Sequence, residues 1–168
     1  MQAMGGAGPF KAMPEPPLAP VDGGNPQMWM SYWRERQAAV PLDFGEDILK
    51  PTEVISVERL VRRRESIRWI PRTHAKSSHD FVWLNRGGVN VEMKATKARY
   101  ETIRGRVFSA RKSAWENHRV LKDVFLIDLG DAPLTTELRH RLVTYQALHN
   151  PGCSWGLNPP ASSRDRAM

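Results

Sequence analysis

Apolar residues recur at helical spacing in four stretches of the chain, and each stretch predicts a helix. The four stretches cover residues 28–40, 51–63, 98–115 and 133–149. In the second stretch, Val54, Val57 and Leu60 share one face. Arginines occupy the opposite face, so this helix is predicted to be amphipathic with a basic outer side.

Shorter apolar runs predict four strands, at 66–71, 81–84, 89–94 and 124–127. Gly87 and Gly88 stand between the second and third runs. Paired glycines supply the positive φ angles of a tight turn, so these two strands are predicted to form a hairpin. The last run is continuously apolar, which is typical of a strand buried on both faces.

The elements between residues 46 and 149 follow the order helix, strand, strand, strand, helix, strand, helix. This order predicts an α/β fold in which a mixed sheet is covered by helices in three layers. Residues 27–45 are expected to form a short helix docked on that domain. Residues 1–26 include 11 Gly or Pro and are expected to form a linker, and 150–168 to form a flexible tail.

Positive charge is concentrated in the middle of the chain. Residues 53–112 contain 15 Lys or Arg and 6 Asp or Glu, a balance of +9, whereas the whole chain of 168 residues carries +7. A local field of this kind attracts polyphosphates, so nucleic acid is the leading class of partner. A solvated basic face is the alternative explanation.

The composition excludes several classes of protein. No stretch reaches the roughly 20 consecutive apolar residues of a membrane span, so we expect no membrane insertion, and we find no classical signal peptide. Cys153 is the single cysteine, which leaves no disulfide within the chain and no cysteine zinc site. The five histidines lack metal-ligand spacing, and only His79 is of interest because it precedes Asp80.

Two carboxylates and a lysine are expected to converge at the predicted hairpin. Glu92 and Lys94 point the same way because side chains alternate along a strand. Asp80 and Glu92 are separated by 11 residues that include the glycine turn, so antiparallel pairing can bring their carboxylates together. Carboxylate oxygens are the ligands that Mg²⁺ and Mn²⁺ prefer, and a cation held there can polarise a scissile phosphate. The alternative is a solvated strand face with Asp80 capping a turn.

The order of these residues resembles a known family of nucleases. Asp80 followed by Glu92-Met93-Lys94 is similar to the Asp…Glu-x-Lys signature of the PD-(D/E)XK superfamily, with His79 where the superfamily's name has Pro. Segments 92–96, 102–106 and 124–129 also resemble, in that order, the C-terminal tRNA nuclease domain of contact-dependent growth inhibition toxins. That domain has a Glu-x-Lys strand, an arginine-bearing helix and a hydrophobic strand ending in Asp. The resemblance covers about residues 50–148.

The resemblance implies a PD-(D/E)XK nuclease-like core and a role for each matching residue. Asp80 and Glu92 would bind the metal, and Lys94 would stabilise the transition state. Glu53 would be a further acid on the first helix of the core, with Glu58 as the fallback. The structural alternative for Glu53 is a first-turn carboxylate that favours the helix dipole. Phosphate contacts are expected from four basic residues: Lys97, Arg104, Arg106 and Lys112.

These observations together predict a nuclease that depends on a divalent metal, Mg²⁺ or Mn²⁺, and cuts tRNA or other RNA. The resemblance further implies a toxin effector with a cognate immunity protein, acting in the cytoplasm of a target cell after delivery. Two alternatives remain open. One is a DNA endonuclease of restriction, repair or phage type, and the other is a non-catalytic basic module that binds nucleic acid.

Overall fold

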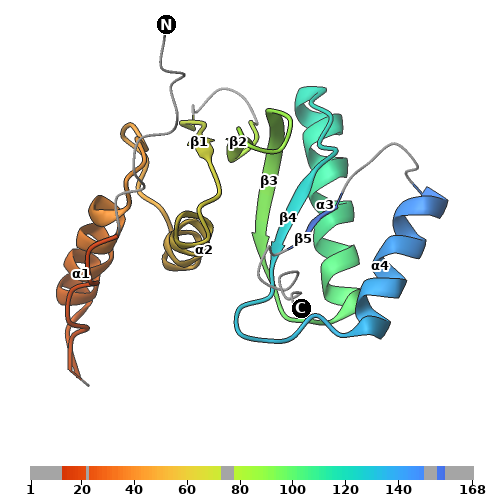
Figure 1. Ribbon diagram of the computed structural model, residues 1–168. Helices are drawn as coiled ribbons and strands as arrows, with labels where there is room; N and C mark the ends of the chain where they lie inside the picture. Colours follow the sequence, from red (N-terminus) through yellow and green to blue (C-terminus); the bar gives the residue numbers. More distant parts are fainter. Residues whose placement is uncertain (1–12, 22, 73–77, 150–154, 158–168) are drawn as a thin grey trace, which may run out of the picture. The chain divides into compact units, whose positions relative to one another are not determined.

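The computed structural model describes residues 13–21, 23–72, 78–149 and 155–157 (Figure 1). The chain divides into two compact units, each of which is described by itself. The first comprises Met1–Leu42 with Ile48–Glu65, and the second comprises Asp43–Asp47 with Ser66–Met168. Within the described residues, no helix has both the length and the apolar character that a membrane span requires.

The first unit begins with helix α1, which spans Pro26–Ala39. Its start is fixed by Asn25, whose Oδ1 accepts a hydrogen bond from the Met28 amide at 2.9 Å. An asparagine cap satisfies an amide that has no partner within the helix, and the proline after it has no amide to satisfy. The helix predicted over 28–40 is confirmed, although it starts inside the segment expected to be a linker.

Helix α2 completes the first unit and spans Pro51–Arg62. Val54, Val57 and Leu60 are buried, which confirms the apolar face that their spacing predicts. Their burial removes apolar surface from water and is the main contribution of this helix to stability.

A mixed sheet of five strands forms the second unit. In spatial order the strands are β1 (Ile67–Trp69), β2 (Phe81–Trp83), β3 (Val89–Ala95), β4 (Phe125–Asp128) and β5 (Trp155–Leu157). β1 runs antiparallel to β2, and β2 runs antiparallel to β3, whereas β4 runs parallel to β3 and β5 runs parallel to β4. The α/β class and the mixed sheet predicted from the order of elements are therefore confirmed.

The glycine turn between β2 and β3 is present. Gly87 and Gly88 have φ angles of +82° and +66°, which residues with a Cβ rarely adopt. Trp83 pairs with Val89 and Phe81 with Val91, so the hairpin closes in register. This register determines which side chains of the two strands face one another.

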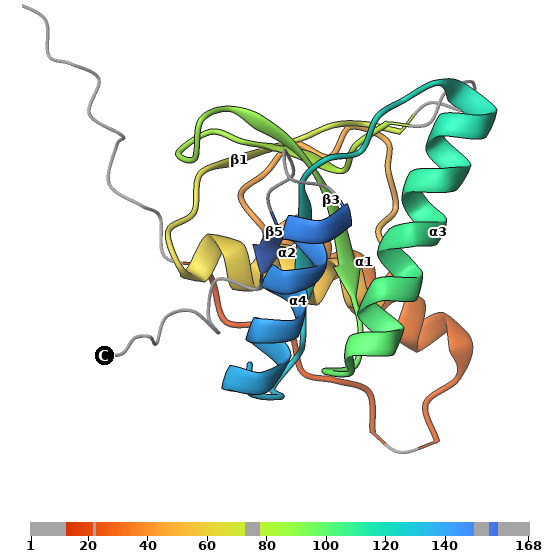
Figure 2. The same cartoon turned by 90° about the vertical axis from the view of Figure 1, so that its right-hand side faces the viewer.

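Two helices cover one face of the parallel part of the sheet. α3 (Tyr100–His118) and α4 (Thr136–His149) lie side by side against it (Figure 2). Their buried residues form a single apolar cluster with those of β4 and the residue after it: Ile103, Val107, Phe125, Ile127, Leu129, Leu138 and Leu142. This cluster packs α3 and α4 against β4, the strand next to β3, which carries Glu92 and Lys94.

The C-terminal segment differs from its prediction. Trp155–Leu157 lies in the segment 150–168 expected to be a flexible tail, yet it forms β5 beside β4. The outer edge of β4 offers unpaired backbone groups, and a short extended segment satisfies them without any long apolar pattern. The rest of that tail, 150–154 and 158–168, lies outside the described residues, as do residues 1–12 and 22 of the expected linker. The boundaries at 27–45 and 46–149 stay predictions.

Candidate active site

The hairpin brings Asp80 close to Glu92. Phe81, the first residue of β2, pairs with Val91, so Asp80 directly precedes this pair on one strand and Glu92 directly follows it on the other. The Asp80 amide donates a hydrogen bond to the Val91 carbonyl at 2.9 Å, so the ladder continues past the end of β2. The two carboxylates that the sequence predicted to meet are therefore brought together by main-chain pairing.

Glu92 is buried, with 5% of its surface exposed, and both of its carboxylate oxygens accept hydrogen bonds from lysines. Lys94 Nζ lies 2.8 Å from Oε1, and Lys122 Nζ lies 2.6 Å from Oε2. A buried carboxylate is costly unless it is paired. The two ammonium groups offset that cost and hold the Glu92 side chain in one orientation.

Asp80 is less well compensated than Glu92. Its Oδ2 accepts a hydrogen bond from the Met93 amide at 2.7 Å, and the Arg72 guanidinium lies 3.5 Å from Oδ1. Burial and, after it, the charge of Glu92 raise the pKa of Asp80 to about 6, against the lowering effect of the Met93 amide, Lys94 and Arg72. A buried carboxyl group with a raised pKa beside a second charged group is a common feature of catalytic sites.

Two further residues lie next to the carboxylates: Lys122 was not predicted to take part, whereas His79 was singled out as the histidine that precedes Asp80. Lys122 is buried with 6% exposed, although lysine is seldom buried. The pKa of the half-buried His79 is lowered by burial and then by the charge of Lys122. The signal for Lys122 lies in the parallel pairing of β3 with β4: Glu92 pairs with Phe125, so the residues just before β4 lie beside Glu92.

The donor set at this site fits a hard divalent cation. Asp80, just before β2, and Glu92 on β3 present carboxylate oxygens, and burial followed by the charge of Glu92 raises the pKa of Asp80. A cation between the two carboxylates would offset both effects. Among the described residues, no three His, Cys, Asp or Glu side chains gather in a metal-binding group. Asp80 and Glu92 are thus the residues that would hold the ion, and water or substrate would complete its coordination.

The two glutamates considered as further acids belong to the first unit. Glu53 Oε2 accepts a hydrogen bond from the Lys50 amide at 2.7 Å and so caps the start of α2. Glu58 is 2% exposed and ion-paired with Arg36. Both carboxylates have a structural partner within their own unit.

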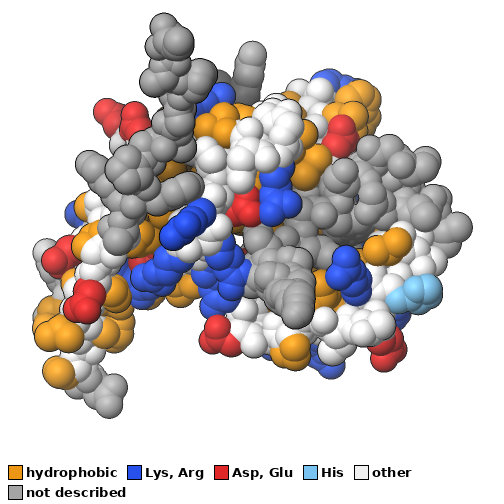
Figure 3. Space-filling model, viewed as in Figure 1, with side chains coloured by type: hydrophobic (Ala, Val, Ile, Leu, Met, Phe, Trp, Pro, Cys, Tyr) orange, Lys and Arg blue, Asp and Glu red, His pale blue; other side chains and the backbone are white. Residues whose placement is uncertain are grey.

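The four predicted phosphate-binding residues are all exposed, on or just before α3. Figure 3 shows that basic side chains reach the surface at several places on the face it presents. The four residues differ in what they face. Arg104 Nε lies 3.9 Å from Glu101, whereas Arg106 lines a groove with Lys94. The structure therefore connects one of the four, Arg106, with the candidate site directly.

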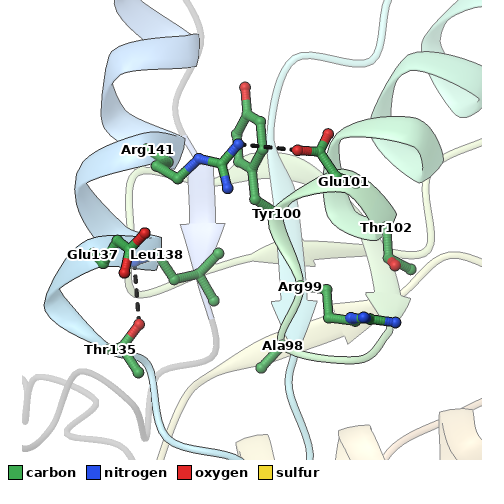
Figure 4. A pocket seen from close by; sticks show the side chains of 9 residues that line it. All are labelled: Ala98, Arg99, Tyr100, Glu101, Thr102, Thr135, Glu137, Leu138 and Arg141. Carbon is green, nitrogen blue, oxygen red and sulfur yellow. Dashed lines mark hydrogen bonds and ion pairs between the residues drawn. The ribbon is translucent and has the colours of Figure 1, made fainter.

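A second hollow of about 530 Å³ lies between the first turns of α3 and α4 (Figure 4). In it, the Arg141 guanidinium lies 4.0 Å from the centre of the Tyr100 ring and bonds Glu101 Oε1 at 2.9 Å. The Tyr100 ring thus has one face covered by the Arg141 guanidinium. Glu101 has its negative charge balanced from the same side.

Comparisons with known proteins find no relative of this chain. No family model, no curated protein and no solved structure matches this chain. The chemistry of the site is therefore what indicates a function.

Proposed function

We propose that this protein is a metal-dependent nuclease that hydrolyses phosphodiester bonds, with tRNA or other RNA as the favoured substrate. The observation that carries the proposal is the closeness of Asp80 to Glu92, whose charge acts on the Asp80 carboxyl, together with the hydrogen bond from Lys94 to Glu92. The raised pKa of Asp80 supports it, because a carboxylate left partly uncompensated is suited to receive a cation. The local charge of +9 over residues 53–112 supports a polyanionic substrate.

Each residue of the site has a role in this proposal. Asp80 and Glu92 hold the Mg²⁺ or Mn²⁺ ion, which when bound polarises the scissile phosphate and acidifies a water molecule. The Lys94 side chain is 28% exposed. Its ammonium group offsets the negative charge that develops on the phosphate. Lys122 keeps the Glu92 carboxylate oriented.

The remaining parts of the proposal follow from the resemblance to toxin nucleases. Glu53 assists as a further acid, and Lys97, Arg104, Arg106 and Lys112 contact substrate phosphates. The chain acts in the cytoplasm of a target cell after delivery and is neutralised by a cognate immunity protein.

A non-catalytic nucleic-acid-binding module is the second candidate function. It is favoured by the ion pairs of Glu92, because Lys94 and Lys122 together occupy both of its oxygens. In that case the cluster is a buried structural network and the basic residues supply binding alone.

Cleavage assays separate these candidates. The full chain is incubated with total tRNA and, separately, with plasmid DNA, each in Mg²⁺ and in EDTA. The proposal predicts cleavage of tRNA that stops in EDTA and in the Glu92→Gln variant. Cleavage of plasmid alone identifies a DNA endonuclease. Binding of tRNA without cleavage of either substrate identifies the non-catalytic module and contradicts the nuclease.

A further inference from the structure

A groove of about 590 Å³ lies between Lys94 on β3 and the outer side of α3. The residues of α3 that line it are Glu101, Thr102, Gly105, Arg106, Ser109 and Ala110. Positions 102, 105, 106 and 109 share one side of a helix, next to the side that packs into the core. The groove therefore begins at a residue of the candidate active site and extends along α3.

The groove carries a positive charge. Lys94 and Arg106 both line it, and Arg106 is exposed. Glu101 is the single acidic residue among its lining, and its carboxylate is bonded to Arg141 at 2.9 Å and lies 3.9 Å from Arg104. Arg141 belongs to the neighbouring hollow in Figure 4, so the negative charge of Glu101 is balanced from outside the groove. A negatively charged ligand is favoured between Lys94 and Arg106.

Gly105 keeps the groove open. A Cβ built at Gly105 meets no atom within 4 Å apart from its own helix and chain neighbours, so no neighbouring element requires a glycine there. Glycine is also unfavourable in the middle of a helix. A helix residue that is costly for the fold and not demanded by packing leaves space for a ligand that approaches the backbone closely.

We propose that this groove binds the sugar–phosphate backbone next to the scissile phosphate, with a phosphate held between Lys94 and Arg106 and the strand lying over Gly105. The ligand class rests on the proposed function, since the site beside Lys94 is taken to act on nucleic acid. Thr102 and Ser109 add hydroxyl groups along the path, which suit RNA because its 2′-OH both donates and accepts hydrogen bonds.

Binding without cleavage tests the groove. Fluorescence anisotropy in EDTA measures the Kd of a labelled single-stranded RNA, and of the DNA of the same sequence, for the full chain. Gly105→Leu fills the groove and is expected to weaken RNA binding about tenfold or more. Arg106→Gln is expected to weaken it similarly and to reduce the slope of log K against log salt by about 0.7. Circular dichroism and melting temperature confirm that each variant is folded.

Asn117→Leu is the matched control for the filled groove. It places the same side chain on the same helix, at an exposed position 12 residues, or about 18 Å, further along. Its RNA affinity should equal that of the unmodified chain. Equal loss of DNA binding in Gly105→Leu supports recognition of the backbone common to both polymers, and loss of RNA binding alone supports contacts to the 2′-OH.

The proposal that the groove binds the sugar–phosphate backbone is contradicted if folded Gly105→Leu and Arg106→Gln both bind RNA and DNA with unchanged Kd. That result leaves the proposed nuclease intact, because cleavage of tRNA is measured separately. The converse result is also informative. If the unmodified chain cuts no nucleic acid, but both groove variants bind RNA more weakly than it does, then binding of nucleic acid in the groove is supported and the nuclease proposal fails.

Discussion

Each unit has, among its described residues, a buried carboxylate paired with basic side chains, and the two carboxylate sites are compensated to different degrees. In the first unit, both carboxylate oxygens of Glu58 accept hydrogen bonds from the Arg36 guanidinium, and Arg36 Nε lies 3.1 Å from Glu58 Oε2. This pairing raises the pKa of Arg36 further above its ordinary value. In the second unit, Glu92 is paired with lysines, but Asp80 close to it has a pKa raised to about 6.

The difference separates a structural carboxylate from a candidate catalytic one. An arginine fork matches a carboxylate in shape and number of bonds, so both oxygens of Glu58 are already bonded to a cation. Burial and, after it, the charge of Glu92 raise the pKa of Asp80, and the Met93 amide, Lys94 and Arg72 do not cancel that rise. The Asp80 carboxyl therefore holds a proton more tightly than usual, and we propose that a metal cation can compensate its charge instead.

The largest expected effect is on catalysis. Glu92→Gln and Asp80→Asn each remove one proposed metal ligand, so the tRNA cleavage rate should fall by about a thousandfold or more. Glu46→Gln, which neutralises an exposed carboxylate of the same unit, is the control and should cleave normally. Full activity in folded Glu92→Gln would remove Glu92 from the active site.

The next effect is on the stability of the first unit. Arg36→Ala leaves Glu58 buried and unpaired with arginine, which should lower the free energy of unfolding by about 3–5 kcal/mol at pH 7. Urea denaturation measures this change, with Arg34→Ala at an exposed position as the control. The cleavage rate per folded molecule should stay the same. A loss of cleavage in folded Arg36→Ala would show that Glu58 is more than a structural residue.

Lys122 tests whether the carboxylate site of the second unit is also needed for stability. Lys122→Met removes the hydrogen bond to Glu92 Oε2 and keeps an unbranched side chain of similar length. The expected loss is about 1.5–3 kcal/mol, the usual value for a hydrogen bond to a charged group. Lys112→Met, at an exposed position, provides the comparison in the same denaturation experiment. Unchanged stability in Lys122→Met would mean that Lys94 alone compensates Glu92.

The smallest expected effect is a gain, not a loss, in the free energy of unfolding. The folded-state pKa of Asp80, about 6, exceeds its ordinary value of 3.8, so the folded protein binds this proton more tightly than the unfolded chain. Asp80 therefore destabilises the fold above pH 6, and this contribution disappears as the pH falls towards 4. Asp80→Asn should raise stability at pH 7 by about 1–2 kcal/mol without added cation, and the gain should vanish near pH 4. A gain that is equal at both pH values would contradict the raised pKa.

Much of the fold follows from local patterns that the sequence displays openly. Asn25 and Pro26 mark the start of α1, and Gly87 with Gly88 marks the hairpin. These signals are local because a cap or a turn depends on a few adjacent residues. β5 carries no such signal, because three residues that complete a sheet edge acquire their conformation from the neighbouring strand.

The site was predictable as far as the hairpin determines it. The alternation of side chains along a strand and the glycine turn were enough to predict that Asp80, Glu92 and Lys94 lie close together. Lys122 was not predicted, because it reaches Glu92 through the parallel pairing of β3 and β4 across the whole of α3. The groove beside Lys94 depends on how α3 packs, and a single sequence does not reveal that packing.

Cation-dependent stability tests the central claim most directly, namely that Asp80 and Glu92 form a cation site and Glu58 does not. The melting temperatures of the unmodified chain, Asp80→Asn and Glu58→Gln are measured in increasing MgCl₂ or MnCl₂, with KCl keeping the ionic strength constant. A ligand that binds only the folded state adds about 2.7 kcal/mol at 100 times its Kd. We predict that the melting temperature rises with the cation in the unmodified chain and in Glu58→Gln, and stays constant in Asp80→Asn. An equal rise in all three proteins, or no rise in the unmodified chain, would contradict the account.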